Sequence, residues 1–173
     1  MNKDIHNIIL RRRSIRVFKQ ESLSQDQILR VIKAGMYAPT AFNVRPWEFV
    51  VLQDEVDRKE IVDKWPWLAP ILSAPVAIIV CGNMTNVEPG TEWWVQDVSC
   101  AMQNMQLQAE ADDLGSVWLG FYPDHARCEA LASMINLPEH IKPFAILAMG
   151  VPAEKFETPD HFQLEKVHWG KLK

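Results

Sequence analysis

The sequence predicts one α+β domain in which helices flank a central sheet. Its 173 residues are 48% hydrophobic and 23% charged, a balance typical of a soluble domain with one core. Two continuous apolar runs of strand length, at residues 75–81 and 144–151, indicate buried strands. Between them, apolar side chains recur at helical spacing over residues 94–109, which predicts a long helix. We therefore expect a single domain over residues 1–173.

The amino-terminal part predicts two helices and then a strand. Isoleucines at helical spacing over residues 5–9 predict a first helix that ends at a group of arginines. Ser24 followed by Gln27 is a capping-box pattern, and the apolar face behind it predicts a helix over residues 24–36. Residues 48–52 (EFVVL) are rich in branched and aromatic side chains and predict a strand.

The middle of the chain predicts two more helices with an irregular segment between them. A helix is expected over residues 53–64, and residues 65–70 (WPWLAP) follow it. Two prolines in six residues exclude a regular helix interior, so we expect a short lid or flap there. After strand 75–81, Thr91 is the expected N-cap of the long helix, and Gly115 is the expected left-handed C-cap.

The carboxyl-terminal part predicts a strand over residues 116–121, a helix over residues 125–136 capped by Asp124, and the last strand at residues 144–151. Residues 152–173 are polar and lack a clear periodicity. The side of the long helix that faces away from the apolar stripe is rich in amides: Gln96, Gln103, Asn104, Gln106 and Gln108. Because amides cost less to bury than ions, this side is a hypothetical subunit interface.

Composition excludes several classes of protein. The net charge of -4 disfavours a nucleic-acid binder, which needs a broad basic surface. Three widely spaced cysteines indicate neither a disulfide framework nor a zinc site, and we expect all three to be buried. The longest apolar run is too short to cross a membrane, and no secretory leader is apparent, so a cytoplasmic location is expected.

The arginines after the first helix are the strongest candidates for binding chemistry. Residues 11–16 read R-R-R-S-I-R, and guanidinium groups match phosphate oxygens with a planar set of donors, to which Ser14 adds a hydroxyl. The group therefore suits a phosphomonoester. The alternative is a solvated basic turn that pairs with the acidic surface.

The order of motifs along the chain strengthens the first interpretation. R-R-R-S-I-R-V-F at residues 11–18 is followed by a helix, by A-P-T-A-F-N-V-R-P-W at residues 38–47 and by a strand. This order resembles the FMN-dependent nitroreductase family. The resemblance continues with D-V-S-C-A-M-Q-N-M-Q-L-Q-A at 97–109, L-G-S-V-W-L-G at 114–120 and A-M-G-V-P at 148–152, so it covers nearly the whole chain.

The resemblance implies a fold and a set of flavin contacts. The implied fold is a central, mostly antiparallel sheet flanked by helices, in an intertwined homodimer whose C-terminal extension wraps over the partner. Two FMN sites are then expected at the interface. The implied cofactor-binding residues are Arg12, Arg13, Ser14 and Arg16 at the phosphate and ribityl chain, Pro39, Thr40, Ala41, Asn43 and Arg45 at the ring, Leu119 and Gly120 beneath it, and Lys155 as a second phosphate contact.

The resemblance also implies a reaction. NADH or NADPH is the transient reductant and passes hydride to flavin N5, and a nitroaromatic, a quinone or a similar small acceptor then takes its place. No catalytic side chain and no metal is required, because the cofactor carries the electron chemistry. Arg45 stands where the family has Gln, and its charge near the pyrimidine end of the ring is expected to favour reduced flavin.

Two alternatives remain open on the sequence. The first is a flavin-binding carrier or sensor without turnover. The second is a flavin-free interaction module in which the arginines bind an acidic partner.

Overall fold

A four-stranded antiparallel sheet forms the centre of the molecule. The computed structural model describes residues 4–154 and 156–171. Within them the strands lie in the order β1-β2-β4-β3, and all three pairings are antiparallel. Their bounds are β1 (Trp47–Leu52), β2 (Val76–Asn83), β3 (Gly115–Gly120) and β4 (Ile141–Gly150). This arrangement confirms the predicted α+β class and the mostly antiparallel sheet.

The two apolar runs of the sequence are the two inner strands, β2 and β4, which are covered on both faces. In β2, Val76, Ile78 and Val80 point into one core, and Ala77 and Ile79 point into the other. Successive side chains of a strand alternate between faces, so a strand between two cores must be apolar throughout. The continuous hydrophobicity of residues 76–81 follows from this position.

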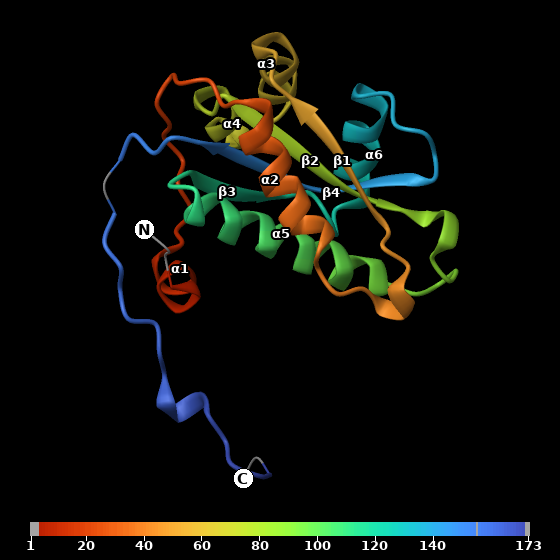
Figure 1. The fold of residues 1–173 in the computed structure, drawn as a ribbon. Coiled ribbons are helices and arrows are strands. Elements are labelled where there is room, and N and C mark those ends of the chain that lie inside the picture. Colours follow the sequence, from red (N-terminus) through yellow and green to blue (C-terminus); the bar gives the residue numbers. More distant parts are fainter. Residues whose placement is uncertain (1–3, 155, 172–173) are drawn as a thin grey trace.

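Helices cover both faces of the sheet (Figure 1). One face carries α2 (Gln25–Met36) and the long α5 (Trp93–Ala111), and α1 (Ile5–Arg11) packs beside α5. The opposite face carries α3 (Glu55–Lys64), α4 (Pro70–Ser73) and α6 (His125–Met134). The chain is thus a three-layer structure in which α5 spans one face. In the part that the structure describes, no helix is long and apolar enough to cross a bilayer.

Side chains at the helix ends confirm two of the predicted caps and correct two others. Ser24 and Gln27 form the expected capping box at α2, and Asp124 accepts a hydrogen bond from the backbone N of Arg127 at α6. At α5 the N-cap is Glu92 rather than Thr91, and the left-handed residue at its end is Asp113, with φ 60°.

Gly115 is required for close packing and not for a turn. A Cβ atom at this position would lie 2.8 Å from Cβ of Ile15, closer than carbon atoms can approach. Gly115 opens β3, and the chain at Ile15 passes directly against it: the backbone N of Ile15 donates to the carbonyl O of Ser116 at 3.0 Å. Its role is therefore to let the amino-terminal segment lie against the sheet.

The expected lid at residues 65–70 is wrong. Pro66–Leu68 is a 3-10 helix, α4 follows it directly, and Leu68 and Ile71 are fully buried. Trp65 packs edge-on against Phe121, with ring centroids 5.2 Å apart. The prolines start two short helical turns, where their missing N–H groups cost nothing, so the segment belongs to the core between α3 and α6.

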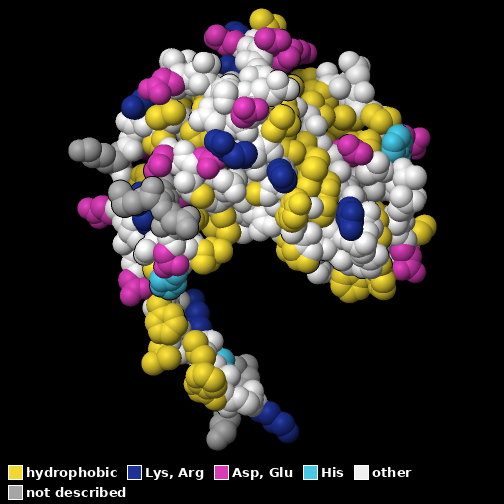
Figure 2. Space-filling view, in the orientation of Figure 1, with side chains coloured by type: hydrophobic (Ala, Val, Ile, Leu, Met, Phe, Trp, Pro, Cys, Tyr) yellow, Lys and Arg dark blue, Asp and Glu magenta, His cyan; other side chains and the backbone are white. Residues whose placement is uncertain are grey.

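The carboxyl-terminal arm, residues 153–154 and 156–171 of the described chain, runs away from the body of the molecule (Figure 1) and carries exposed apolar side chains (Figure 2). Phe162, Leu164 and Trp169 are exposed, Trp169 by 91%. Hydrophobic side chains in such a row on a chain end have no core of their own. One cysteine also departs from expectation, since Cys100 on α5 is exposed while Cys81 and Cys128 are buried.

Candidate functional site

The arginine cluster, Arg12, Arg13, Ser14 and Arg16, lies where α1 ends and the chain runs against the first residues of β3. Ser14 forms a parallel bridge with Ser116, which fixes the backbone of the cluster at the edge of the sheet. Arg11 is directed elsewhere, because its Nε lies 3.4 Å from Oε1 of Glu110 on α5. The structure thus brings the four predicted phosphate ligands together and excludes Arg11.

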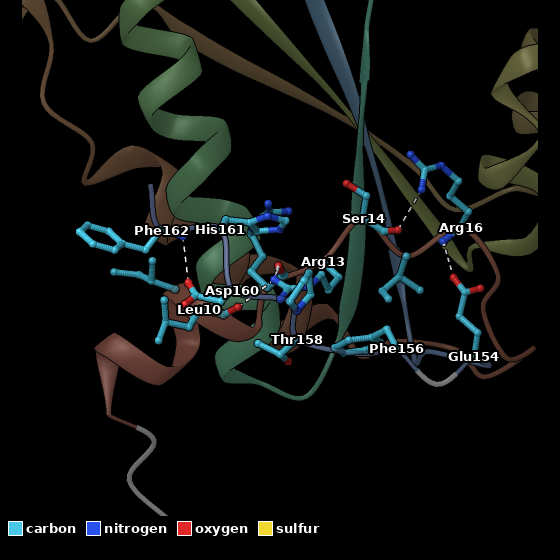
Figure 3. A pocket seen from close by; sticks show the side chains of 14 residues that line it. Leu10, Arg13, Ser14, Arg16, Glu154, Phe156, Thr158, Asp160, His161 and Phe162 are labelled. Carbon is cyan, nitrogen blue, oxygen red and sulfur yellow. Dashed lines mark hydrogen bonds between the residues drawn. The ribbon is translucent and has the colours of Figure 1, made fainter. Parts of the chain in front are cut away.

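A cavity of about 1080 Å³ opens at this cluster (Figure 3). One wall comes from the end of α1 and the cluster, and the other comes from the arm of the same chain. The lining residues are Ile9, Leu10, Arg12, Arg13, Ser14, Ile15, Arg16, Glu154, Phe156, Thr158, Pro159, Asp160, His161 and Phe162. The cavity thus joins segments about 140 residues apart in the sequence.

The arginines in this cavity have different partners. Arg13 donates from Nη1 to the carbonyls of Leu10 and Arg12, and from Nε to the carbonyl of Glu157 on the arm. Its Nη2 is buried and has no hydrogen-bond partner among the described residues. A buried, unpaired guanidinium nitrogen is costly, so it indicates an acceptor that completes the site.

The charges of the cavity also fit an anion. Three guanidinium groups face two carboxylates, Glu154 and Asp160, so positive charge is in excess. Glu154 accepts a hydrogen bond from the backbone N of Arg16 at 3.1 Å and not from its side chain. The guanidinium of Arg16 makes one described hydrogen bond, from Nη1 to the carbonyl of Ser14. The phosphate of a mononucleotide suits this set of donors. The predicted contact Lys155 lies outside the described residues. His161, six residues further along the sequence, lines the cavity.

The second predicted half of the site, residues 39–45, lies elsewhere. This ring segment contains a short 3-10 helix at Ala41–Asn43 and three non-glycine residues with positive φ: Phe42, Asn43 and Arg45. Arg45 donates from Nε to Oδ1 of Asn43, so its side chain folds over the segment. Ala41 and Phe42 line a separate cavity of about 230 Å³ with Trp93, Trp94 and Asp97 at the start of α5.

Helix α5 separates the two halves. The ring segment is bound to Asp97, and the arginine cluster follows Arg11, which pairs with Glu110. These two positions are thirteen residues apart on one helix, a separation of about 20 Å. One chain therefore presents both predicted halves but does not bring them together.

The two predicted residues beneath the ring divide into a core residue and an open position. Leu119 is buried in the core with α6, so its side chain cannot contact a ligand. Gly120 is exposed, and a Cβ atom there would have Trp118 Nε1 as its nearest neighbour at 3.8 Å. Packing within the chain therefore does not require glycine at residue 120, and the backbone there is open to approach.

Sequence reasoning missed Asp97 and the arm residues of the cavity. Asp97 is 6% exposed, and its burial raises the pKa of the carboxyl above its usual range, while the hydrogen bond from Ala41 acts in the opposite direction. An Asp within a predicted helix usually lies on the solvated face of the helix, so no local signal marks Asp97. The arm has no periodicity that would place it against α1.

The two buried cysteines, Cys81 and Cys128, are poor candidates for nucleophiles. Burial raises the pKa of Cys81 to about 12 and that of Cys128 to about 11, which disfavours a reactive thiolate. No group of three or more His, Cys, Asp or Glu side chains with the geometry of a metal site occurs among the residues described.

Known proteins are similar to this chain in both sequence and fold. The nitroreductase family matches residues 9–65 and 63–151. A protein of Methanothermobacter thermautotrophicus, provisionally named NADH dehydrogenase/NAD(P)H nitroreductase, is 37% identical over 97% of this chain and 87% of its own length. A crystal structure under the same provisional name from Bacteroides thetaiotaomicron has a TM-score of 0.91 at 32% identity, covering 99% of this chain and 100% of that chain.

A third relative was crystallised with a ligand. It is a protein of Desulfovibrio desulfuricans, provisionally named a nitroreductase and solved in complex with FMN, with a TM-score of 0.87 at 25% identity over 100% of both chains. The family match spans most of the sequence, and the relatives cover nearly all of it. The chain therefore belongs to the nitroreductase family.

Proposed function

We propose that the protein is an FMN-dependent oxidoreductase that takes electrons from NADH or NADPH and gives them to a small acceptor such as a nitroaromatic or a quinone. Family membership supports this, as do relatives named NAD(P)H nitroreductase and FMN reductase. Within the chain, the observation that supports it best is the cavity where three arginines meet and a guanidinium nitrogen of Arg13 is buried without a partner among the described residues.

The protein's own residues bind and orient the cofactor. Arg12, Ser14 and Arg16 hold the phosphate and ribityl chain, and Arg13 contributes its unpaired Nη2. When bound, FMN would accept a hydride from the nicotinamide and release it to the acceptor in two separate half-reactions. No side chain has to act as acid or nucleophile in this scheme.

A second copy of the chain completes the site. Because α5 holds the arginine cluster and the ring segment about 20 Å apart, we expect the ring segment of one copy to meet the arginine cluster of the other. The apolar side chains on the arm support the same homodimer, since a partner surface would cover them. The whole chain, residues 1–173, then acts as one FMN-binding domain.

A visible spectrum tests the proposal. Apoprotein is reconstituted with FMN, gel-filtered, and examined under anaerobic conditions before and after addition of NADH or NADPH. We expect a yellow protein that bleaches with the reductant and regains its colour when a quinone or a nitroaromatic is added.

The other possible outcomes of this experiment support the alternative functions or contradict the proposed dimer. A colourless protein after reconstitution excludes flavin binding and points to an interaction module. A yellow protein that neither NADH nor NADPH bleaches is a flavin carrier or sensor without turnover. Sedimentation of the yellow protein at micromolar concentration as a monomer would contradict the shared site.

A further inference from the structure

Asp97 is a buried carboxylate that the scheme above leaves without a role. It lies in the first turns of α5, next to Trp94 and Val98, which are both in the core beneath the sheet. Only 6% of Asp97 is exposed. A carboxylate is expensive to bury, so its position requires a partner that repays desolvation.

The partner is the backbone of the ring segment. The N–H of Ala41 donates to Oδ1 of Asp97 at 2.8 Å, across 56 residues of sequence. Ala41 is the first residue of the 3-10 helix, whose first N–H groups have no acceptor inside the helix. Thr40 is the N-cap residue of this short helix, and its side chain makes no cap hydrogen bond with it.

The hydroxyl of Thr40 has a different task. It accepts the backbone N–H of Arg45 at 3.2 Å and so closes the segment upon itself. Asp97 thus accepts the first N–H of the 3-10 helix and connects the segment to α5. One bond closes the segment internally, and the other ties its start to the helix.

The segment needs such support because its backbone is strained. Phe42, Asn43 and Arg45 have φ values of 52°, 58° and 54°, a region that residues with a Cβ atom seldom occupy. Phe42 is 85% exposed, so its side chain makes little contribution to holding the turn. Strained backbone persists only where its surroundings fix it, and the described bond that connects this turn to a helix is the one to Asp97.

We propose that Asp97 is a positioning residue: it holds the strained ring segment in the conformation that contacts the flavin of the partner subunit. This inference rests on the proposed function for its ligand. The hydrogen bond and the strained turn, in contrast, exist without any ligand, so they allow a separate test.

The test compares two substitutions at Asp97 with one at Asp112, the C-cap residue of α5. Asp97→Leu has nearly the shape of Asp and lacks the acceptor, while Asp97→Asn keeps an acceptor oxygen without the charge. Asp112→Ala is the control, because Asp112 is an acceptor at the other end of the same helix and bonds with Arg30 and Gln108, away from the ring segment.

Two readouts are needed. The first is amide hydrogen exchange at residues 40–45 in flavin-free protein, and the second is the affinity of the apoprotein for FMN, from quenching of flavin fluorescence. We expect Asp97→Leu to accelerate exchange at Ala41 and to weaken FMN binding roughly ten- to hundredfold, as for loss of a hydrogen bond to a charged group. Asp97→Asn and Asp112→Ala are expected to stay close to the unchanged protein in both readouts.

The outcomes separate this proposal from the function on which it rests. Unchanged exchange at residues 40–45 in Asp97→Leu overturns the positioning role, whatever the flavin does. Faster exchange with unchanged FMN affinity also overturns it, because the segment would then not matter to the ligand. If the unchanged protein binds no FMN, the proposed function fails, and exchange alone decides whether Asp97 fixes the segment.

Discussion

Single arginines in the same short stretch have different environments. Arg11 pairs with Glu110, Arg13 binds mainly backbone carbonyls, and Arg12 and Arg16 line the cavity with their guanidinium groups less engaged. The sequence R-R-R-S-I-R indicates a phosphate site, but it does not distinguish these roles. They depend on where α1 ends, and helix ends cannot be located within one residue from sequence.

Arg12→Ala and Arg16→Ala are expected to weaken FMN binding by about 1.5–3 kcal/mol each, the range for hydrogen bonds to a charged group. Arg11→Ala is the matched control, because it removes the same side chain at the neighbouring position without changing the cavity wall. Titration of each apoprotein with FMN measures the effect. Equal losses in all three variants would show that general positive charge, not these two contacts, holds the ligand.

Gly120 and Leu119 show a related limit at the residue scale. Both belong to a motif that suggests contact with the ring, yet Leu119 is a core residue and Gly120 alone is open. Alternation along β3 produces this difference, since neighbouring side chains point to opposite faces. A motif therefore predicts the region of a site more reliably than the contact of each member.

Among the elements, two helices differ in how their first turn is capped. At α6, Asp124 accepts from the N of Arg127 at 3.1 Å, whereas Asp54, the N-cap of α3, makes no side-chain cap. Asp124→Ala should lower the free energy of unfolding by about 1 kcal/mol, and Asp54→Ala by clearly less. Urea unfolding of both variants measures this. Equal losses in both variants would mean that the negative charge at the helix N-terminus, not the hydrogen bond, dominates.

Elements with a strong repeating pattern were predicted well, and elements fixed by distant contacts were not. The capping box at Ser24 and the inner strands follow from local sequence and the alternation of side chains. The prediction that Gly115 caps a helix is wrong, because glycine is needed there for close packing against Ile15, about 100 residues away. The prolines at 66 and 70 suggested a flap, yet they open short turns that the core holds in place.

At the scale of the whole molecule, the sequence predicted the sheet and its helical layers, and it placed the candidate site residues in two segments, 12–16 and 39–45. It did not predict their separation, which depends on the direction of α5 and on which end each segment reaches. The family resemblance implied a carboxyl-terminal extension, but the arm residues that line the cavity could not be predicted, because an extended segment without periodicity has no preferred neighbour in the sequence alone. The amide-rich side of α5 remains a predicted interface, although Asn104 donates to the carbonyl of Ala34 and so also serves α2.

Because the two half-sites lie at opposite ends of one helix, two different defective chains should complement each other in a mixed dimer. A chain with Arg12→Ala and Arg16→Ala and a chain with Asp97→Leu are each defective, but at different ends of α5. If they are refolded together, mixed pairs assemble one site from two sound halves and one from two damaged halves. Complementation should restore about a quarter of the flavin sites, which absorbance of the separated mixture can count. Sites contained within single chains would gain nothing from the mixing.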